Sequence, residues 1–244
     1  VSNIMYSYNN GKDQWLLGTA TIKARIIDGL NFHGSANVDR RQYQGVYYED
    51  FQHINSIKNN RQGYASHEFN KTNNVSYDAY LSYLKEFGEN KEHRLDATAG
   101  WSFWEHNQEQ FSANNADFSV NGIGPWNLGE GTFLKDGVAG MGSSKGTRNR
   151  LLSFFARANY SYDDKYMASA SVRREASSKF GSNNRWGTFW AVSGGWRISR
   201  EEFMENTRDW LSDLKLRVAY GVTGNNGFGS GNTVTRLTSY GGYP

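Results

Sequence analysis

The residues with the widest chemical repertoire in this sequence are five histidines, and their spacing argues against a shared metal ion. No two of them are separated by one or three residues, and the chain has no cysteine to supply a thiolate. We therefore expect no metal site and no other cofactor. The histidines are His33, His53, His67, His93 and His106.

Two further motifs have the appearance of reactive sites. The run GMGSSKGT at 140–147 contains glycines and a lysine, but it lacks the order of a phosphate-binding loop and a strand-to-helix context. We interpret it as a flexible loop. Paired acids occur at Asp163-Asp164 and at Glu201-Glu202, where a turn and the start of a helix explain them. No catalytic residue is predicted, and we do not expect an enzyme.

The aromatic-rich segment between Trp101 and Trp126 holds the best ligand-binding candidates. Trp104 falls on the polar face of a predicted strand, and Trp126 follows Pro125 in the longest predicted loop. Flat aromatic faces suit sugar rings and peptide side chains. A second interpretation stays open, in which Trp104 is an interfacial anchor and Trp126 packs within its loop. The substrate-binding prediction consists of Trp104 and Trp126.

Composition narrows the class of protein that could position these residues. Only 37% of the chain is hydrophobic, yet 15% is aromatic, which is unlike a disordered chain. A net charge of +3 without a basic block gives no indication of nucleic-acid binding. No run approaches the roughly 20 apolar residues of a membrane helix. The composition is typical of transmembrane barrels with a watery lumen, and also of secreted β-sandwiches and carbohydrate-binding modules.

Period-two alternation of apolar and polar residues predicts eight β-strands. Residues 163–165 form a three-residue turn between two of them, and Asp28-Gly29 is a strong two-residue turn signal. A turn is also expected at 88–93. The predicted strands are 16–27, 30–39, 75–85, 94–103, 152–162, 166–173, 186–198 and 214–222.

The connections between these strands indicate how the strands are joined. Residues 40–66 and about 105–149 are expected to be long loops. The segment 199–210 is expected to form one or two helical turns with Ser199 as N-cap. Residues after 222 are glycine-rich and then a candidate for another strand. Short and longer connections largely alternate, as in an up-and-down transmembrane barrel, whereas a Greek-key sandwich gives no reason for this order.

The two faces of the predicted strands differ in a way that suits a membrane. Apolar and aromatic residues occupy one face, with aromatic residues near the strand ends, as in the aromatic girdles of membrane barrels. Four arginines fall on the polar face, where they avoid the roughly 2–4 kcal/mol cost of facing mid-bilayer lipid. They are Arg157, Arg173, Arg197 and Arg217. An amphipathic sheet packed on another protein layer remains an alternative.

Five sequence blocks within residues 151–226 closely resemble the barrel of SusC/RagA-type TonB-dependent outer-membrane transporters of Bacteroidetes. In this order the blocks are specific to that family, and they cover about a third of the chain. The first 150 residues resemble the family only in their pattern of hairpins and variable loops. The blocks are NYSY (159–162), ASVRR (170–174), SSKFG (177–181), NRWG (184–187) and LKLRVAYGVTGN (214–225).

The resemblance implies an all-β, antiparallel up-and-down transmembrane β-barrel of about 22 strands with a plug domain inside. It also implies TonB-dependent import of glycan oligosaccharides or peptides across the bacterial outer membrane. The implied partners are a SusD-like surface lipoprotein, TonB, the substrate and outer-membrane lipid, without nucleic acid. The loops at 40–66 and 106–149 are candidates for contacting the lipoprotein.

With eight strands, residues 1–244 are expected to be part of one such barrel domain, without the signal peptide, plug or TonB-contacting segment. A self-closed eight-stranded barrel would not explain the resemblance. The alternative function is that of a secreted or surface β-rich carbohydrate-binding module without transport activity. The two differ in whether the apolar face contacts lipid or is buried; its diagnostic residues are Leu152, Phe154, Val172, Val192 and Val218.

Overall fold

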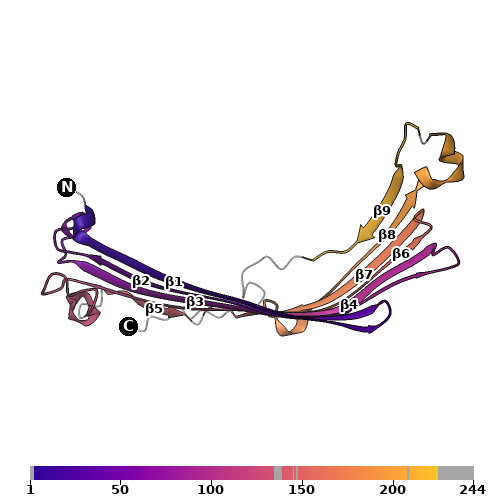
Figure 1. Ribbon diagram of the computed structural model, residues 1–244. Helices are drawn as coiled ribbons and strands as arrows, with labels where there is room; N and C mark the ends of the chain where they lie inside the picture. Colours follow the sequence, from indigo (N-terminus) through magenta and orange to yellow (C-terminus); the bar gives the residue numbers. More distant parts are fainter. Residues whose placement is uncertain (1–2, 135–138, 145, 147, 208, 225–244) are drawn as a thin grey trace. The chain divides into compact units, whose positions relative to one another are not determined.

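The computed structural model of the chain describes residues 3–134, 139–144, 146, 148–207 and 209–224 (Figure 1). Eight strands lie side by side in chain order within one antiparallel sheet, and a short strand, β5 (Met141–Ser144), pairs with β4 off this path. The predicted all-β, up-and-down meander is therefore confirmed. The eight strands are β1 (Ser7–Ile27), β2 (Leu30–Glu49), β3 (Tyr64–Phe87), β4 (His93–Ala116), β6 (Asn149–Tyr162), β7 (Tyr166–Ser177), β8 (Trp186–Arg197) and β9 (Lys215–Gly221).

Helices in the described residues are short and lie in the connections. One α-helix, α1 (Ile54–Lys58), follows β2. None of the described helices has the length and hydropathy needed to cross a membrane. The remaining helices are 3-10 turns: η1 (Asn3–Tyr6), η2 (Leu128–Glu130), η3 (Thr132–Leu134), η4 (Ser182–Asn184), η5 (Ile198–Arg200) and η6 (Glu202–Thr207).

The turns predicted between strands are present. Asp163 and Asp164 both adopt positive φ, 51° and 52°, which the short polar side chain of aspartate tolerates. Gly29 has φ 78°, and a Cβ at this position would lie 2.4 Å from the carbonyl oxygen of Leu84. The β1–β2 turn therefore needs glycine both for its backbone conformation and for space. The β3–β4 turn occupies 88–92, because β4 begins at His93.

The strand register divides β6 to β9 into two faces. Residues paired directly across antiparallel strands lie on the same side of a sheet. Ala156 pairs with Val172, and Val192 pairs with Tyr220, so the even-numbered residues share one face. We call this the apolar face, and the opposite face, which carries Arg157, the polar face.

Several predicted boundaries were wrong because the strands continue where the alternation ends. β2 extends through 40–49, β3 begins at Tyr64, and β4 continues to Ala116, so large parts of the two predicted loops are strand. Polar residues occupy both faces of these extensions, so no apolar period marks them. Their backbone hydrogen bonds within the sheet still stabilise them.

Two local predictions also need correction. Met141–Ser144 of the predicted flexible loop forms β5, with Phe111 paired to Ser143. The predicted helix at 199–210 consists of 3-10 turns, and Ser199 is not an N-cap but lies within η5, where its hydroxyl donates to Asp213 Oδ1 over 2.9 Å. The candidate strand after 224 lies outside the described residues.

The chain divides into two compact units, which we describe separately. Unit 1 comprises 1–18, 38–74 and 106–148, and unit 2 comprises 19–37, 75–105 and 149–244. Unit 1 has a small core in which Tyr48, Ala65 and Phe118 are buried, with Phe51 and Leu128 packed against them. In the described part of unit 2, no hydrophobic side chain is fully buried. Unit 2 is thus a single amphipathic layer.

Candidate functional site

The apolar face of unit 2 carries large hydrophobic side chains that nothing in the described residues covers. Phe154, Val172, Val192 and Val218 are all exposed, and Val218 retains 67% of its accessible surface. These are residues that a soluble module would have to bury. A shallow apolar groove of about 470 Å³ crosses this face over β3, β4, β6 and β7. Its lining includes Leu81, Tyr83, Ala97, Ala99, Ala156 and Val172.

An aromatic row marks the apolar face at the short-turn end of the strands. Tyr162 pairs with Tyr166, and Tyr166 pairs with Trp196 on the next strand. Tyr166 and Trp196 both donate hydrogen bonds to Glu201 Oε1, over 2.6 and 2.9 Å. The rings therefore present their apolar bodies on the sheet and their polar atoms toward the connection, the arrangement expected at a membrane–water interface.

A second aromatic group lies at the other end of the same strands. The rings of Phe154 and Trp186 are stacked with centroids 6.3 Å apart. The Arg174 guanidinium lies 5.1 Å from the centre of the Trp186 ring. Arg174 pairs with Phe154 and so lies on the apolar face, unlike the four predicted lumenal arginines. Its place at the strand end, over a tryptophan ring, suits a cation at an interface.

The separation of the two aromatic groups fits a bilayer. Trp186 and Trp196 lie ten residues apart on the same face of β8. At roughly 3.3 Å per residue this is about 33 Å along the strand. With the strand tilt of about 40° usual for membrane barrels, it corresponds to a height of about 25 Å, that of their apolar band. Unit 2 therefore has the dimensions of a membrane-crossing wall.

The polar face of unit 2 is held by hydrogen bonds between side chains of neighbouring strands. From β2 to β3, His33 contacts Ser82 over 3.0 Å, and Asn37 donates to Ser76 over 3.1 Å. The His33 ring also stacks on Tyr80, with centroids 4.6 Å apart. These contacts between polar groups are compatible with a face that borders water.

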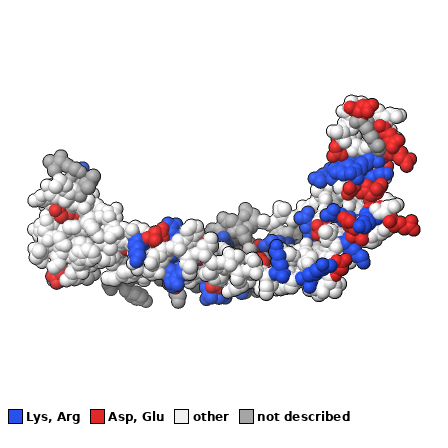
Figure 2. Space-filling view, in the orientation of Figure 1, with Lys and Arg blue, Asp and Glu red and all other residues white. Residues whose placement is uncertain are grey.

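The four predicted arginines lie on the polar face, and their partners differ. Arg173 contacts Glu175 over 2.8 Å, and Arg197 lies 3.4 Å from Asp213. Arg157 and Arg217 line a cavity of about 500 Å³ together with residues of β4 and β7 to β9. Figure 2 shows basic side chains, with acidic ones between them, over the region of β6 to β9.

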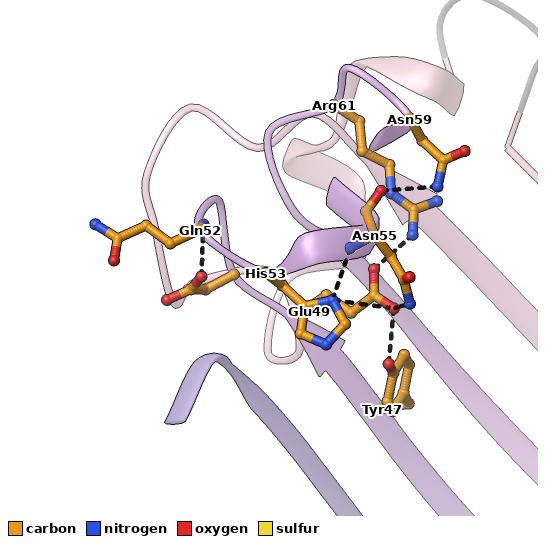
Figure 3. Close-up of polar contacts among 8 residues, drawn as sticks. Tyr47, Glu49, Gln52, His53, Asn55, Asn59 and Arg61 are labelled. Atoms are coloured by element: carbon orange, nitrogen blue, oxygen red, sulfur yellow. Dashed lines mark hydrogen bonds and ion pairs between the residues drawn. The ribbon is translucent and has the colours of Figure 1, made fainter. Parts of the chain in front are cut away.

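In unit 1 a buried carboxylate organises the connection between β2 and β3 (Figure 3). Glu49 has only 3% of its side chain exposed. It accepts hydrogen bonds from Tyr47 over 2.7 Å, from Asn55 over 2.9 Å and from Arg61 over 2.6 Å. The His53 ring, which caps α1 by accepting from the Asn55 N–H, lies 3.6 Å from the same carboxylate. The network thus ties α1 and its flanking segments to the end of β2.

The charge state of this network follows from its contacts. Burial by itself raises the pKa of Glu49, but hydrogen bonds from Asn55, Tyr47 and Arg61 and the positive charge of Arg61 bring the pKa below its ordinary value. Burial and the hydrogen bond to Glu49 raise the pKa of Tyr47 to about 12. Glu49 is therefore ionised and Tyr47 protonated at neutral pH. Sequence reasoning missed this cluster because its members lie in a region interpreted as an irregular loop.

The two predicted substrate-binding tryptophans fall in different units. Trp104 belongs to β4 in unit 2 and is 39% exposed. Trp126 belongs to unit 1, is 72% exposed, and lies 6.1 Å from the Tyr8 ring between centroids. Their role in ligand binding stays a prediction.

The described residues contain no group of three histidine or carboxylate side chains arranged to bind a metal ion. The acid pairs have local roles, since Asp163 and Asp164 form the β6–β7 turn and Glu201 accepts from Tyr166.

Comparisons with known proteins identify relatives over most of the chain. It is 32% identical over 239 residues to the TonB-dependent receptor SusC of Bacteroides thetaiotaomicron, covering 92% of this chain and 22% of that protein. It is 29% identical over 208 residues to the TonB-dependent receptor P39 of Formosa agariphila, covering 85% of this chain and 19% of that protein. The chain thus spans about a fifth of the length of these curated relatives. No protein-family model matches it.

Solved structures agree on the fold. The RagAB peptide transporter matches with a TM-score of 0.77 and 24% identity, covering 93% of this chain and 24% of that chain. The RagAB peptide importer in its open-open state matches with a TM-score of 0.78 and 23% identity, covering 98% of this chain and 26% of that chain.

Proposed function

Because this chain belongs to the SusC/RagA-type TonB-dependent receptors, we propose that residues 1–244 form part of the barrel wall of an outer-membrane importer. The importer takes up glycan oligosaccharides or peptides by a TonB-dependent mechanism, and it works with a SusD-like surface lipoprotein. Enzymatic activity is not part of this proposal.

The observation that carries the proposal is the exposed apolar face of unit 2, which lies between the aromatic row at one end of the strands and the second aromatic group at the other. On this face Val172 and Val192 are exposed, while the opposite face carries Arg157 and Arg217. A lipid layer would cover the first face and water the second. The secreted carbohydrate-binding module is disfavoured because it would leave these hydrophobic residues in water.

Strand lengths support different roles for the two units of the chain. β6 to β8 contain 14, 12 and 12 residues, and a strand needs about 9–11 residues to cross a bilayer. β1 to β4 contain 20 to 24 residues each. We assign the membrane-crossing role to unit 2, whereas the α1 connection of unit 1 is the candidate region for contacts with the lipoprotein or substrate.

The proposal is tested with the full-length protein in its native outer membrane. We expect it in the detergent-resistant outer-membrane fraction, co-purifying with a SusD-like lipoprotein. Uptake of its substrate should stop when TonB is depleted and return when TonB is restored. Recovery as a water-soluble protein that binds carbohydrate, with uptake unaffected by TonB, would instead favour the binding-module alternative.

A further inference from the structure

Three basic side chains on the polar face of unit 2 have no carboxylate partner among the residues that the structure describes. Arg157 donates to the amide oxygen of Asn159 over 3.2 Å. The Lys215 ammonium contacts the Met167 sulfur over 2.7 Å. Arg217 forms no ion pair within the described ranges. Arg157 and Lys215 thus contact neutral groups, and the carboxylates that act on Lys215, those of Asp213 and Asp164, lie beyond ion-pair distance.

Other arginines on the same face show the contrast. Arg173 is paired with Glu175, and Arg197 lies beside Asp213. The sheet thus supplies carboxylates to some of its polar-face cations and not to others. Lys215 and Arg217 lie two residues apart on the same face of β9, and Arg157 of β6 lines the same cavity from across β7 and β8.

The cavity itself has the character of an anion subsite; we call it the basic cavity. It measures about 500 Å³, within the range of roughly 300–1,000 Å³ typical of small-molecule sites. Its lining carries four cations, Arg94, Arg157, Lys215 and Arg217, and one carboxylate, Asp96. Serine hydroxyls of β6 to β8 lie among them, including Ser169 and Ser193, which are hydrogen-bonded to each other over 2.6 Å. A hollow lined mainly by one sign of charge concentrates ions of the other sign.

We propose that the basic cavity is a subsite for carboxylate groups of the solute that this protein transports. The inference rests on the proposed function and narrows the substrate to acidic oligosaccharides or acidic peptides. Arginine and lysine bind carboxylates through charge-assisted hydrogen bonds, and the neighbouring hydroxyls suit the remaining polar atoms of such a solute. Charge complementarity therefore favours an acidic solute over a neutral one.

The test compares charged and neutral probes of equal size on the purified full-length protein with its lipoprotein. One pair is fluorescent tetragalacturonate and its methyl ester, and the other is an aspartate-containing tetrapeptide and its asparagine counterpart. We expect wild-type protein to bind at least one acidic probe about tenfold more tightly than its neutral partner, with affinity falling as NaCl rises. The pair that discriminates identifies the source of the carboxylate.

The triple variant Arg157→Gln/Lys215→Gln/Arg217→Gln should lose this preference, while binding of the neutral probes stays unchanged. Lys215→Arg retains the charge and should retain the preference. The matched control is Arg25→Gln, which removes an exposed arginine paired with Asp28 at the β1–β2 turn and should have no effect.

Equal binding or no binding of the acidic and neutral probes by wild-type protein would overturn the inference. So would a triple variant that melts at a lower temperature while keeping the wild-type preference, since the cations would then serve an acidic segment of the same protein. TonB-dependent uptake, measured separately in cells, reports on the proposed function and does not depend on this preference.

Discussion

At the scale of single residues, Glu49 illustrates how a polar loop is ordered without a large core. Its carboxylate accepts from three side chains, of which Arg61 lies twelve residues further along the chain. The guanidinium of Arg61 also lies 4.3 Å from the centre of the Tyr64 ring. Charge-assisted hydrogen bonds at a buried carboxylate are stronger than those between neutral groups. The network therefore joins Tyr47 of β2, Asn55 of α1 and Arg61 beyond it through one carboxylate.

Replacing Glu49 with glutamine should loosen this connection. The change removes the ion pair with Arg61 and leaves a buried guanidinium without its charged partner, at a cost of roughly 1–3 kcal/mol. We expect faster limited proteolysis within 50–63 in the full-length protein. The control Glu68→Gln alters an exposed carboxylate on β3 and should leave proteolysis unchanged, and equal effects of both variants would contradict a special role for Glu49.

The same network predicts a pH dependence with a definite sign. Because the pKa of Glu49 is lowered in the folded protein, its stabilising contribution is complete above the ordinary value of 4.5 and is lost as pH falls through the folded pKa. We expect protection of 50–63 from an acid-tolerant protease to decrease below pH 4.5 in wild-type protein. In Glu49→Gln this decrease should be absent; an unchanged acid transition in the variant would assign it to another group.

Trp126 is the predicted ligand contact that can be tested with least effect on stability. Because 72% of its surface is exposed, Trp126→Ala should leave the melting temperature nearly unchanged. If the ring stacks on substrate, affinity should fall roughly threefold to tenfold, as aromatic contacts contribute about 0.5–1.5 kcal/mol. Titration calorimetry with the transported solute measures this. Trp210→Ala, at an equally exposed tryptophan of unit 2, is the control, and unchanged affinity in Trp126→Ala would remove Trp126 from the site.

At the scale of elements, the hairpins depend on a few backbone positions. Gly29 combines a positive φ with a close approach to the carbonyl oxygen of Leu84. The backbone N–H of Leu84 also donates a hydrogen bond to the carbonyl oxygen of Gly29 over 2.9 Å. The β1–β2 turn is thus fastened to β3. A side chain at this position would strain the turn and disturb that contact at once.

Gly29→Ala should therefore impair assembly of the barrel. We expect the full-length variant to lose heat-modifiable mobility on gels at a temperature several degrees below that of wild-type protein. Gly194→Ala provides the matched control, because a Cβ added at this position of β8 meets nothing within 4 Å. Equal melting of Gly29→Ala and Gly194→Ala would show that the turn tolerates a side chain.

A lysine introduced on the apolar face of β7 should destabilise the protein, whereas a lysine on its polar face should not. Val172 is on the apolar face near the middle of the strand, and its neighbour Ser171 is on the polar face. Val172→Lys should destabilise the membrane-embedded protein by about 2–4 kcal/mol, because a lysine would face lipid at mid-membrane depth. Ser171→Lys should have little effect. Unfolding of the full-length protein in lipid vesicles measures both, and similar values would exclude lipid contact on this face.

At the scale of the whole molecule, β1 and β9 are the outer strands of the described sheet, and no described strand pairs with their outer edges. An unpaired strand edge is costly within a membrane because its N–H and C=O groups find no water. Exposed side chains on both strands, including Ile22 and Val218, lie beside these edges. Under the proposed function, further strands of the full-length barrel pair with both.

Hydrogen exchange on the full-length protein tests this closure. We expect the amides of 19–27 in β1 and 215–221 in β9 to be as strongly protected as those of β7, because each would be a central strand of a closed barrel. The turn amides at 88–92 should exchange rapidly and serve as an internal reference. Fast exchange along alternate amides of β1 or β9 would indicate an open sheet instead.

The sequence by itself determined the parts of this fold in which one face differs from the other. Alternation around Val172 and Val192, with Asp163-Asp164 and Gly29 at the turns, was enough to predict an antiparallel meander and to place four arginines on the polar face. These signals are local, since a period of two and a turn conformation depend only on neighbouring residues.

Only the tertiary structure decided where the strands end and which distant residues meet. The extensions at 40–49 and 105–116 have polar residues on both faces, so their ladder hydrogen bonds, and not a hydrophobic period, define them. The pairing of Phe111 with Ser143 and the shared cavity of Arg157 and Arg217 join residues far apart in the chain. Such contacts follow from strand register, which a single sequence does not specify when both faces of a strand are wet.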